Sequence, residues 1–251
     1  AAAIYYESMG QNWERAAMIK ARPAAGDLAL GQEFLSRLKP YIWRKYLDFA
    51  AIADVQSLKR QIHAVKGHGQ ITVLGHNVKL GRGGIREIEF FVQTQQLIAG
   101  GRNPTLRGLR TLDMLDALAA AGWITSEAAE TLKAAYRFLR GIEHRLQMMN
   151  DEQTQLLPDT ESEFATFSRF AGFAEPQELA SKLRSTFESV QRHYAALFEN
   201  AEELGHEAGN LVFTGGEDDP GTIETLSRLG FKQPSEVSAT IRGWHFGRYA
   251  A

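Results

Sequence analysis

The sequence predicts a mainly α-helical protein, in which a helical bundle follows one small extended segment. Apolar residues recur at three- and four-residue steps through most of the chain, which is the pattern of amphipathic helices. Only the stretch around residues 71–80 combines a β-type apolar run with flanking glycines. The composition, 44% hydrophobic and 23% charged residues, is ordinary for a globular protein.

Two helices are expected at the start of the chain. The first spans residues 9–21, and Pro23 stops it. The second spans about residues 28–46, with Asp27 as its N-cap. Pro40 is expected to break or kink this second helix, because proline lacks the backbone N–H that a helix interior needs.

A third helix is expected from residue 48 to residue 66, with a regular apolar stripe on one face. Lys59, His63 and Lys66 lie together on a neighbouring face. Such a row is either a solvated helix surface or a contact surface for an anion, and both interpretations stay open.

Two short extended pieces, Ile71–Leu74 and Asn77–Leu80, are expected next and are the main strand signal of the chain. A helix then spans residues 84–99 and ends at a Gly-Gly pair. The remaining helices are expected at residues 109–121, 126–150, 161–171, 176–203, 222–229 and 234–244. An acidic, glycine-rich linker precedes the last two of them.

The stretch VKLGRGGIREIEFF is the strongest candidate for a functional site. Gly83 and Gly84 allow positive φ and close approach, and the start of a helix supplies backbone amides that could hold a phosphate. Lys79, Arg82 and Arg86 supply positive charge. The spacing is not that of a P-loop, since no Gly-Lys-Ser/Thr follows. Tight packing of backbone against backbone explains the glycines equally well.

The sequence offers little support for a metal-binding site or for a catalytic nucleophile. Glu87 and Glu89 lie about 200° apart on a helix, so they cannot share a metal ion. One of them is expected to support the helix N-terminus, and the other is expected to face water. The seven histidines have no metal-ligand spacing, and there is no cysteine. We therefore predict no catalytic and no metal-binding residue in this chain.

The net charge of −2 hides an asymmetry. Residues 1–92 hold 13 Lys and Arg against 8 Asp and Glu, and the remainder holds 15 against 22. The basic first third indicates either an anionic partner or attraction between two faces of one domain.

Three quoted stretches resemble one protein family: YYESMGQNWERAAMIKARPAAGD, HNVKLGRGGIREIEFFVQTQQLIAGGRNPTLR and YRFLRGIEHRLQMMNDEQTQLLP. They are similar to the bacterial glutamine synthetase adenylyltransferase/adenylyl-removing enzymes, and the resemblance extends over nearly the whole chain. In that family two nucleotidyltransferase units of the DNA polymerase β superfamily occur in tandem. The first unit removes AMP from glutamine synthetase and the second attaches it. The form GRGGIREIEFF resembles the first, adenylyl-removing half.

One departure from the family pattern sets the expected role. Members of the superfamily hold Mg²⁺ and the nucleotide with a Gly-Ser turn followed by Asp-x-Asp, and this chain has neither. The resemblance therefore implies a segment downstream of the catalytic metal motif. Mg²⁺ and ATP or ADP are implied for the parent enzyme, whereas the isolated segment is expected to bind neither and to be inactive.

The resemblance also implies a division of the chain. Residues 1–92 would be the C-terminal helical part of the adenylyl-removing unit, with the extended segment at the edge of its nucleotidyltransferase domain. Residues 93–203 would be a helical bundle, and residues 204–251 a linker and short helices that lead toward the second half. The candidates for the boundary of the active site are Lys79, Arg82, Gly83, Gly84, Arg86 and Glu87.

Glutamine synthetase and a PII signalling protein are the expected partners, in the cytoplasm, with no nucleic acid and no membrane. Two alternatives stay open. The chain could be the helical region of a PII uridylyltransferase-related protein, or a pure binding module for glutamine synthetase or the PII protein.

Overall fold

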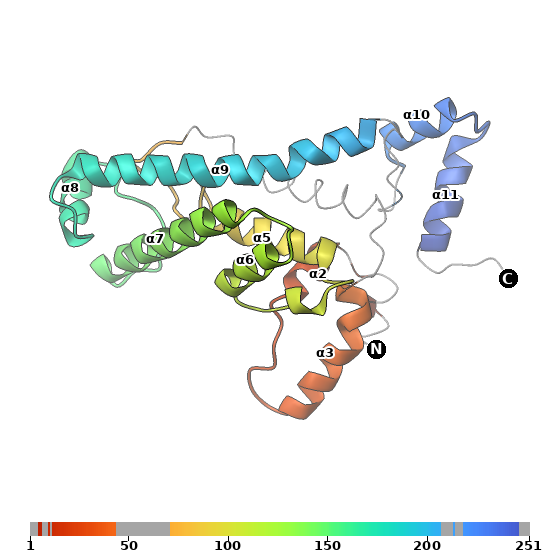
Figure 1. Cartoon of the computed structure of the whole chain (residues 1–251), viewed down its shortest axis with the longest axis horizontal. Helices are drawn as coiled ribbons and strands as arrows, with labels where there is room; N and C mark the ends of the chain where they lie inside the picture. The colour runs from red at the N-terminus through yellow and green to blue at the C-terminus, as the bar shows by residue number, and fades with distance from the viewer. Residues whose placement is uncertain are drawn as a thin grey trace. The chain divides into compact units, whose positions relative to one another are not determined.

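The computed structural model describes residues 5–6, 10, 12–43, 71–206, 213 and 218–245. These residues form nine α-helices and one 3₁₀ turn, with no β-strand among them (Figure 1). The mainly helical fold predicted from the sequence is thus confirmed. No helix in this part of the chain is both long enough and apolar enough to cross a membrane.

The chain divides into two compact units. The first comprises Ala1–Gln61, Gln96–Arg107 and Phe198–Ala251, and the second comprises Ile62–Gln95 and Gly108–Leu197. The functional division expected at residues 92 and 203 concerns a longer parent protein and stays a prediction.

In the first unit, α2 (Asn12–Met18) and α3 (Leu28–Ile42) pack together. Asp27 caps α3 as expected, because its carboxylate accepts a hydrogen bond from Leu30 N–H at 2.9 Å. Of the two effects expected of Pro40, the break does not occur within α3, although the helix ends at Ile42 and not at residue 46. Pro40 lies in the last turn, where the helix closes with a 2.8 Å bond from Trp43 N–H to the Lys39 carbonyl, so little helix remains to be disrupted.

Among the described residues of this unit, one buried hydrophobic cluster is formed by Ile19, Leu38, Tyr41, Ile42 and Leu97. The short 3₁₀ turn η1 (Pro104–Leu106) also belongs to this unit. Near the end of the chain, α10 (Pro220–Arg228) and α11 (Pro234–His245) form a helical hairpin. The expected helix at residues 48–66, with Lys59, His63 and Lys66, lies outside the described residues.

The second unit contains most of the helical bundle. Its helices are α5 (Ile85–Ala99), α6 (Thr111–Ala120), α7 (Ser126–Asn150), α8 (Glu161–Phe170) and α9 (Pro176–His206), of which α5 and α9 continue into the first unit. The sequence predicts an apolar seam on α7, and most of it is buried: Leu132, Leu139, Ile142 and Leu146 are at most 4% exposed. The other two predicted members differ, since Tyr136 is half-buried and Met149 is 38% exposed.

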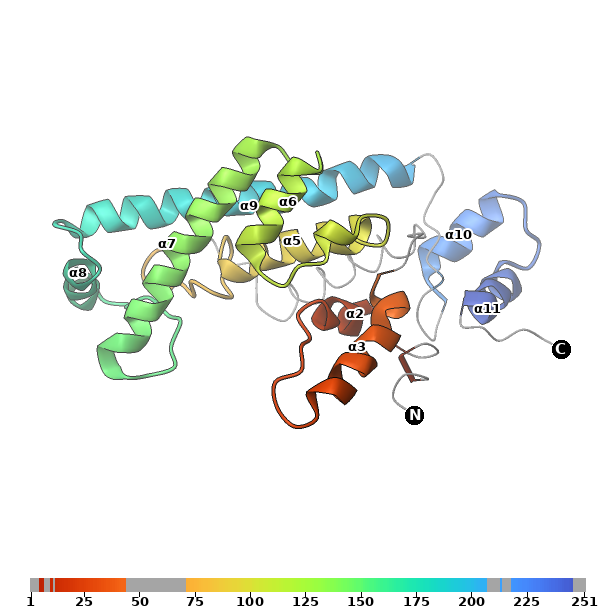
Figure 2. The ribbon, with the colours of Figure 1, turned by 60° about the horizontal axis from the view of Figure 1, so that its bottom comes forward.

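Helix α5 contacts both long helices of this unit (Figures 1 and 2). Its Glu89 accepts a hydrogen bond from Tyr136 of α7, and its Phe90 packs edge-on against Tyr194 of α9 with ring centroids 5.9 Å apart. The start of α5, where the glycine-rich turn lies, is therefore held from two sides.

The strands predicted at Ile71–Leu74 and Asn77–Leu80 do not form. Only one isolated bridge, between Asn77 and Leu156, appears in the described residues. The Asn77 side chain accepts hydrogen bonds from the backbone N–H groups of Lys79 and Leu80, at 3.1 and 2.8 Å. This side-chain turn competes with a strand ladder for the same backbone donors, which explains why the β-type pattern misled the prediction.

Candidate functional site

The glycine-rich turn approaches α9 at a distance that only glycine permits. Gly83 has φ +75°, and a Cβ built on it would lie 2.5 Å from Phe187 Cα and 2.6 Å from the Phe187 carbonyl carbon. Real Cβ atoms essentially never come closer than 3.0 Å to such neighbours. Close packing of two backbones therefore accounts for Gly83, as the second of the two sequence interpretations held.

His76 ties the turn to the same place on α9. Its ring lies 4.3 Å from the Phe187 ring, and its Nε2 is 3.1 Å from the Arg82 carbonyl oxygen. The side chain is buried, and burial lowers the pKa of His76 below its ordinary value. His76 thus holds the backbone of Arg82 in place.

The backbone amides at the start of α5 are already occupied by partners within the protein. Five bonds use the consecutive amides, from Gly83 N to Glu87 Oε2 (3.0 Å), Gly84 N to Gly81 O (3.0 Å), Ile85 N to Val78 O (3.0 Å), Arg86 N to Lys79 O (2.9 Å) and Glu87 N to Gly84 O (3.1 Å). The expectation of available amides at this helix start is therefore wrong. Any phosphate bound here must be held by side chains, since the backbone donors are already used.

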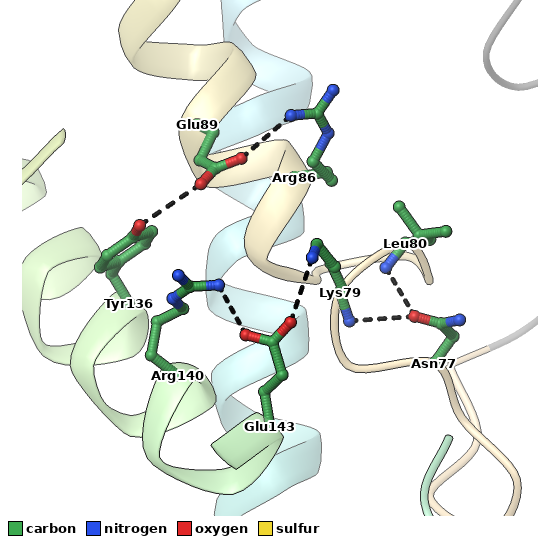
Figure 3. Close-up of polar contacts among 8 residues, drawn as sticks. All are labelled: Asn77, Lys79, Leu80, Arg86, Glu89, Tyr136, Arg140 and Glu143. Atoms are coloured by element: carbon green, nitrogen blue, oxygen red, sulfur yellow. Dashed lines mark hydrogen bonds and ion pairs between the residues drawn. The ribbon is translucent and has the colours of Figure 1, made fainter. Parts of the chain in front are cut away.

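The two glutamates of α5 have different environments. Glu87 supports the N-terminus of the helix, as expected for one of the pair. Glu89 does not face water: its side chain is 19% exposed, accepts a hydrogen bond from Tyr136 Oη at 3.3 Å, and pairs with Arg86 Nη1 at 3.2 Å (Figure 3). Burial, together with the nearby Glu89 charge, raises the pKa of Tyr136.

A buried carboxylate on α7 links the turn to the bundle. The Glu143 side chain is 2% exposed, and its two oxygens lie 3.3 Å from Lys79 Nζ and 2.6 Å from Arg140 Nη1 (Figure 3). In the sequence, Glu143 stands in the mid-helix stretch IEHR, a pattern typical of a salt-linked or hydrogen-bonded packing feature, and its ion pairs bear this out, whereas nothing singled out Arg140. A signal was present, because Glu143 falls on the buried side of the α7 seam, where a carboxylate needs a cationic partner.

The cations of the site differ in how far they are neutralised. Lys79 and Arg140 share the Glu143 carboxylate, and Arg86 pairs with Glu89 while its side chain stays 61% exposed. Arg82 is exposed and has no ion pair with any described residue. The candidates named from the sequence thus lie together on the turn and the start of α5, with a surplus of positive charge.

The described part of the chain contains no candidate metal-binding site. No group of three or more His, Asp or Glu side chains there could hold a metal ion. Glu87 is occupied by the turn and Glu89 by Tyr136 and Arg86. The residues that the structure describes therefore do not fit a Mg²⁺ centre.

Two family models match the chain. Residues 55–198 match the model described as GlnD PII-uridylyltransferase, and residues 1–37 match the one described as glutamate-ammonia ligase adenylyltransferase. The glycine-rich turn and most of the bundle lie within the first of these matches.

Curated proteins align with the whole chain. It is 62% identical over 251 residues to a bifunctional glutamine synthetase adenylyltransferase/adenylyl-removing enzyme of Brucella melitensis, and 62% identical over 249 residues to the protein of that name from Mesorhizobium japonicum. The similar protein of Caulobacter vibrioides is 55% identical over 251 residues. The alignments include 99% or more of this chain but only 26%, 25% and 26% of these relatives, so the chain spans about a quarter of their length.

Proposed function

Because the chain belongs to the family described as GlnD PII-uridylyltransferase, and is 62% identical along its length to glutamine synthetase adenylyltransferase/adenylyl-removing enzymes, we propose that it works within such an enzyme. In this proposal the parent attaches AMP to glutamine synthetase and removes it, in response to nitrogen supply. The chain supports the adenylyl-removing site and contributes to docking of glutamine synthetase and a PII signalling protein in the cytoplasm.

The observation that carries the proposal is the fixed cationic turn, in a chain that is similar to these enzymes along its whole length. Lys79, Arg82 and Arg86 lie at one end of α5, and backbone bonds, Gly83 packing and His76 fix the turn that carries them. Preorganised cations stabilise negative charge on a phosphoryl group more effectively than mobile ones, because no reorganisation is needed during the reaction. We propose that this turn borders the active site.

In this proposal, the Mg²⁺-dependent step of the parent enzyme uses no metal ligands from this chain. Nucleotidyl transfer uses Mg²⁺ to neutralise charge on the phosphoryl centre. The sequence has no Gly-Ser turn followed by Asp-x-Asp, and the described residues do not fit Mg²⁺, so we propose that the Mg²⁺ and ATP or ADP sites depend on residues outside this chain. The role left to Lys79, Arg82 and Arg86 is to attract and orient a phosphate. The isolated chain would then be inactive.

A second candidate function follows from the first family match. The model described as GlnD PII-uridylyltransferase spans the bundle, which favours a helical module common to two kinds of nucleotidyltransferase. The whole-chain identity to the glutamine synthetase enzymes favours the first proposal over a PII uridylyltransferase. A pure docking module would need no fixed cations at the turn.

The proposal is tested by Arg82→Ala and Arg86→Ala in the full-length protein. Hydrogen bonds to charged groups contribute about 1.5–3 kcal/mol, so phosphorolytic release of AMP from adenylylated glutamine synthetase should fall roughly tenfold to a hundredfold. The melting temperature should barely change, because both side chains are exposed. Arg184→Ala on the exposed face of α9 is the matched control and should keep full activity. Unchanged release in both turn variants would contradict the proposal.

A further inference from the structure

The Glu143 carboxylate is unusual because two cations share it. A buried carboxylate needs one compensating positive charge, and Arg140 supplies it at 2.6 Å. Lys79 then adds a second charge at 3.3 Å from the other oxygen. The trio therefore carries one net positive charge, although its carboxylate is almost completely withdrawn from water.

Both cationic side chains are partly exposed to solvent. The Lys79 and Arg140 side chains are 34% and 36% exposed, whereas that of Glu143 is 2% exposed. An ammonium group has three N–H donors and a guanidinium group has five, and the contacts with Glu143 use only part of them. The two cations contact the two oxygens of one carboxylate (Figure 3), so an anion that contacts both would need to span only the distance across that carboxylate.

The two cations are also held in place. The Lys79 backbone donates to Asn77 Oδ1 at 3.1 Å, and its carbonyl accepts from Arg86 N at 2.9 Å. The Arg140 guanidinium lies 5.9 Å from the centre of the Tyr136 ring. A site whose donors are fixed before binding loses less conformational entropy when the ligand arrives.

Among the described residues, the other two carboxylates of the site have partners of their own. Glu87 accepts from Gly83, and Glu89 is occupied by Tyr136 and Arg86. Arg82 on the turn adds a further positive charge, which pairs with no carboxylate among the described residues. Phosphate suits this arrangement, because guanidinium groups bind it in a bidentate manner and lysine binds it as a point charge.

We propose that Lys79 and Arg140, positioned by Glu143, form a phosphate-binding site between the glycine-rich turn and α7. The ligand is a phosphate group, either inorganic phosphate or the terminal phosphate of a nucleotide. Its use in adenylyl removal rests on the proposed function, whereas the binding itself does not. Arg140 comes from the bundle, so the site extends beyond the turn.

Isothermal titration calorimetry of the full-length protein with inorganic phosphate tests this site. Lys79→Gln should weaken phosphate binding about tenfold or more, as expected for loss of a charge-assisted hydrogen bond. The variant should fold, because Glu143 keeps its closer partner Arg140. Arg140→Lys keeps a cation for Glu143 but loses the guanidinium fork, and it should weaken binding by a smaller factor.

Arg137→Gln is the control, since it removes the same charge from an exposed position one turn earlier on α7. It should change the phosphate affinity less than twofold. An equal loss in Arg137→Gln and Lys79→Gln would overturn the proposal in favour of a diffuse field, and so would a Lys79→Gln variant whose affinities for inorganic phosphate and for ADP are both unchanged. A parallel titration with ADP identifies the source: a Lys79 effect on ADP but not on inorganic phosphate assigns the site to the nucleotide.

Failure of this inference is distinguishable from failure of the proposed function. Phosphate binding that depends on Lys79, in a protein that releases no AMP from glutamine synthetase, would uphold the site and reject the function. AMP release that is normal in Lys79→Gln, together with unchanged affinities for inorganic phosphate and for ADP, would reject the site alone.

Discussion

Replacing Gly83 by alanine tests whether the glycine-rich turn is held by backbone packing. The substitution adds one methyl group at φ +75°, where a side chain is strained, and directs it at the backbone of Phe187. Two separate costs follow. The left-handed conformation costs about 1–2 kcal/mol for a residue with a Cβ. Forcing a methyl group into close-packed surroundings adds about 1–3 kcal/mol.

The two costs together predict a loss of about 2–5 kcal/mol in the free energy of unfolding. For a protein of this size, a melting temperature about 4–20 °C lower should follow. Thermal unfolding followed by circular dichroism at the helix band measures the shift. The loss should be large because the obstacle is the α9 backbone, which cannot rotate away as a flexible side chain could.

Gly122→Ala separates the two costs. Gly122 has φ +73°, but a Cβ there would meet nothing within 4 Å, so only the conformational cost applies. The Gly83 variant should lose about 1–3 kcal/mol more than the Gly122 variant, which is the packing contribution. Equal losses in the two variants would refute the view that Gly83 is required by its approach to Phe187.

Two further predictions concern the bundle and the turn. Leu139→Ala should lower the free energy of unfolding by about 2–5 kcal/mol, because Leu139 is fully buried in the α7 seam. Met148→Ala, on the exposed side of the same helix, should change it by less than about 0.5 kcal/mol. Chemical denaturation measures both values, and similar losses in the two variants would contradict the assigned seam. Burial lowers the pKa of His76 below 6.5, so the unfolded state binds more protons in acid, and stability should fall as the pH drops through 6.5 toward the lowered pKa of the folded state. His76→Gln should make this fall shallower between about pH 7 and 5 without abolishing it, because burial also lowers the pKa of His193; an unchanged pH profile would contradict the assignment.

Helix positions were largely predictable because they depend on local pattern. The apolar spacing and the cap at Thr125 define α7, whose observed limits, Ser126–Asn150, equal the predicted ones. Helix α9 extends three residues beyond its expected end at residue 203. The prediction failed at Asn77, where a side chain that bonds the next backbone amides replaced the expected strand.

The candidate site was predictable only in part. Glycines and basic residues in one short stretch identified Lys79, Arg82 and Arg86 without any structure. Whether the helix-start amides were available could not be predicted, because their acceptors at Val78 and Lys79 depend on how the preceding loop folds back. Arg140 and Glu143 lie more than fifty residues away in sequence, so no local pattern connects them to the turn.

The sequence by itself determined the helical class, most helix limits and the family, because periodicity, caps and long identical stretches are properties of neighbouring residues. Only the tertiary structure decided which partners the hydrogen-bond donors of the glycine-rich turn bind. Its amides bond within the chain, Gly83 lies against Phe187, and Lys79 reaches a carboxylate on α7. These outcomes depend on distances between segments that are remote in sequence, and a close approach or a buried charge pair exists only after those segments have packed.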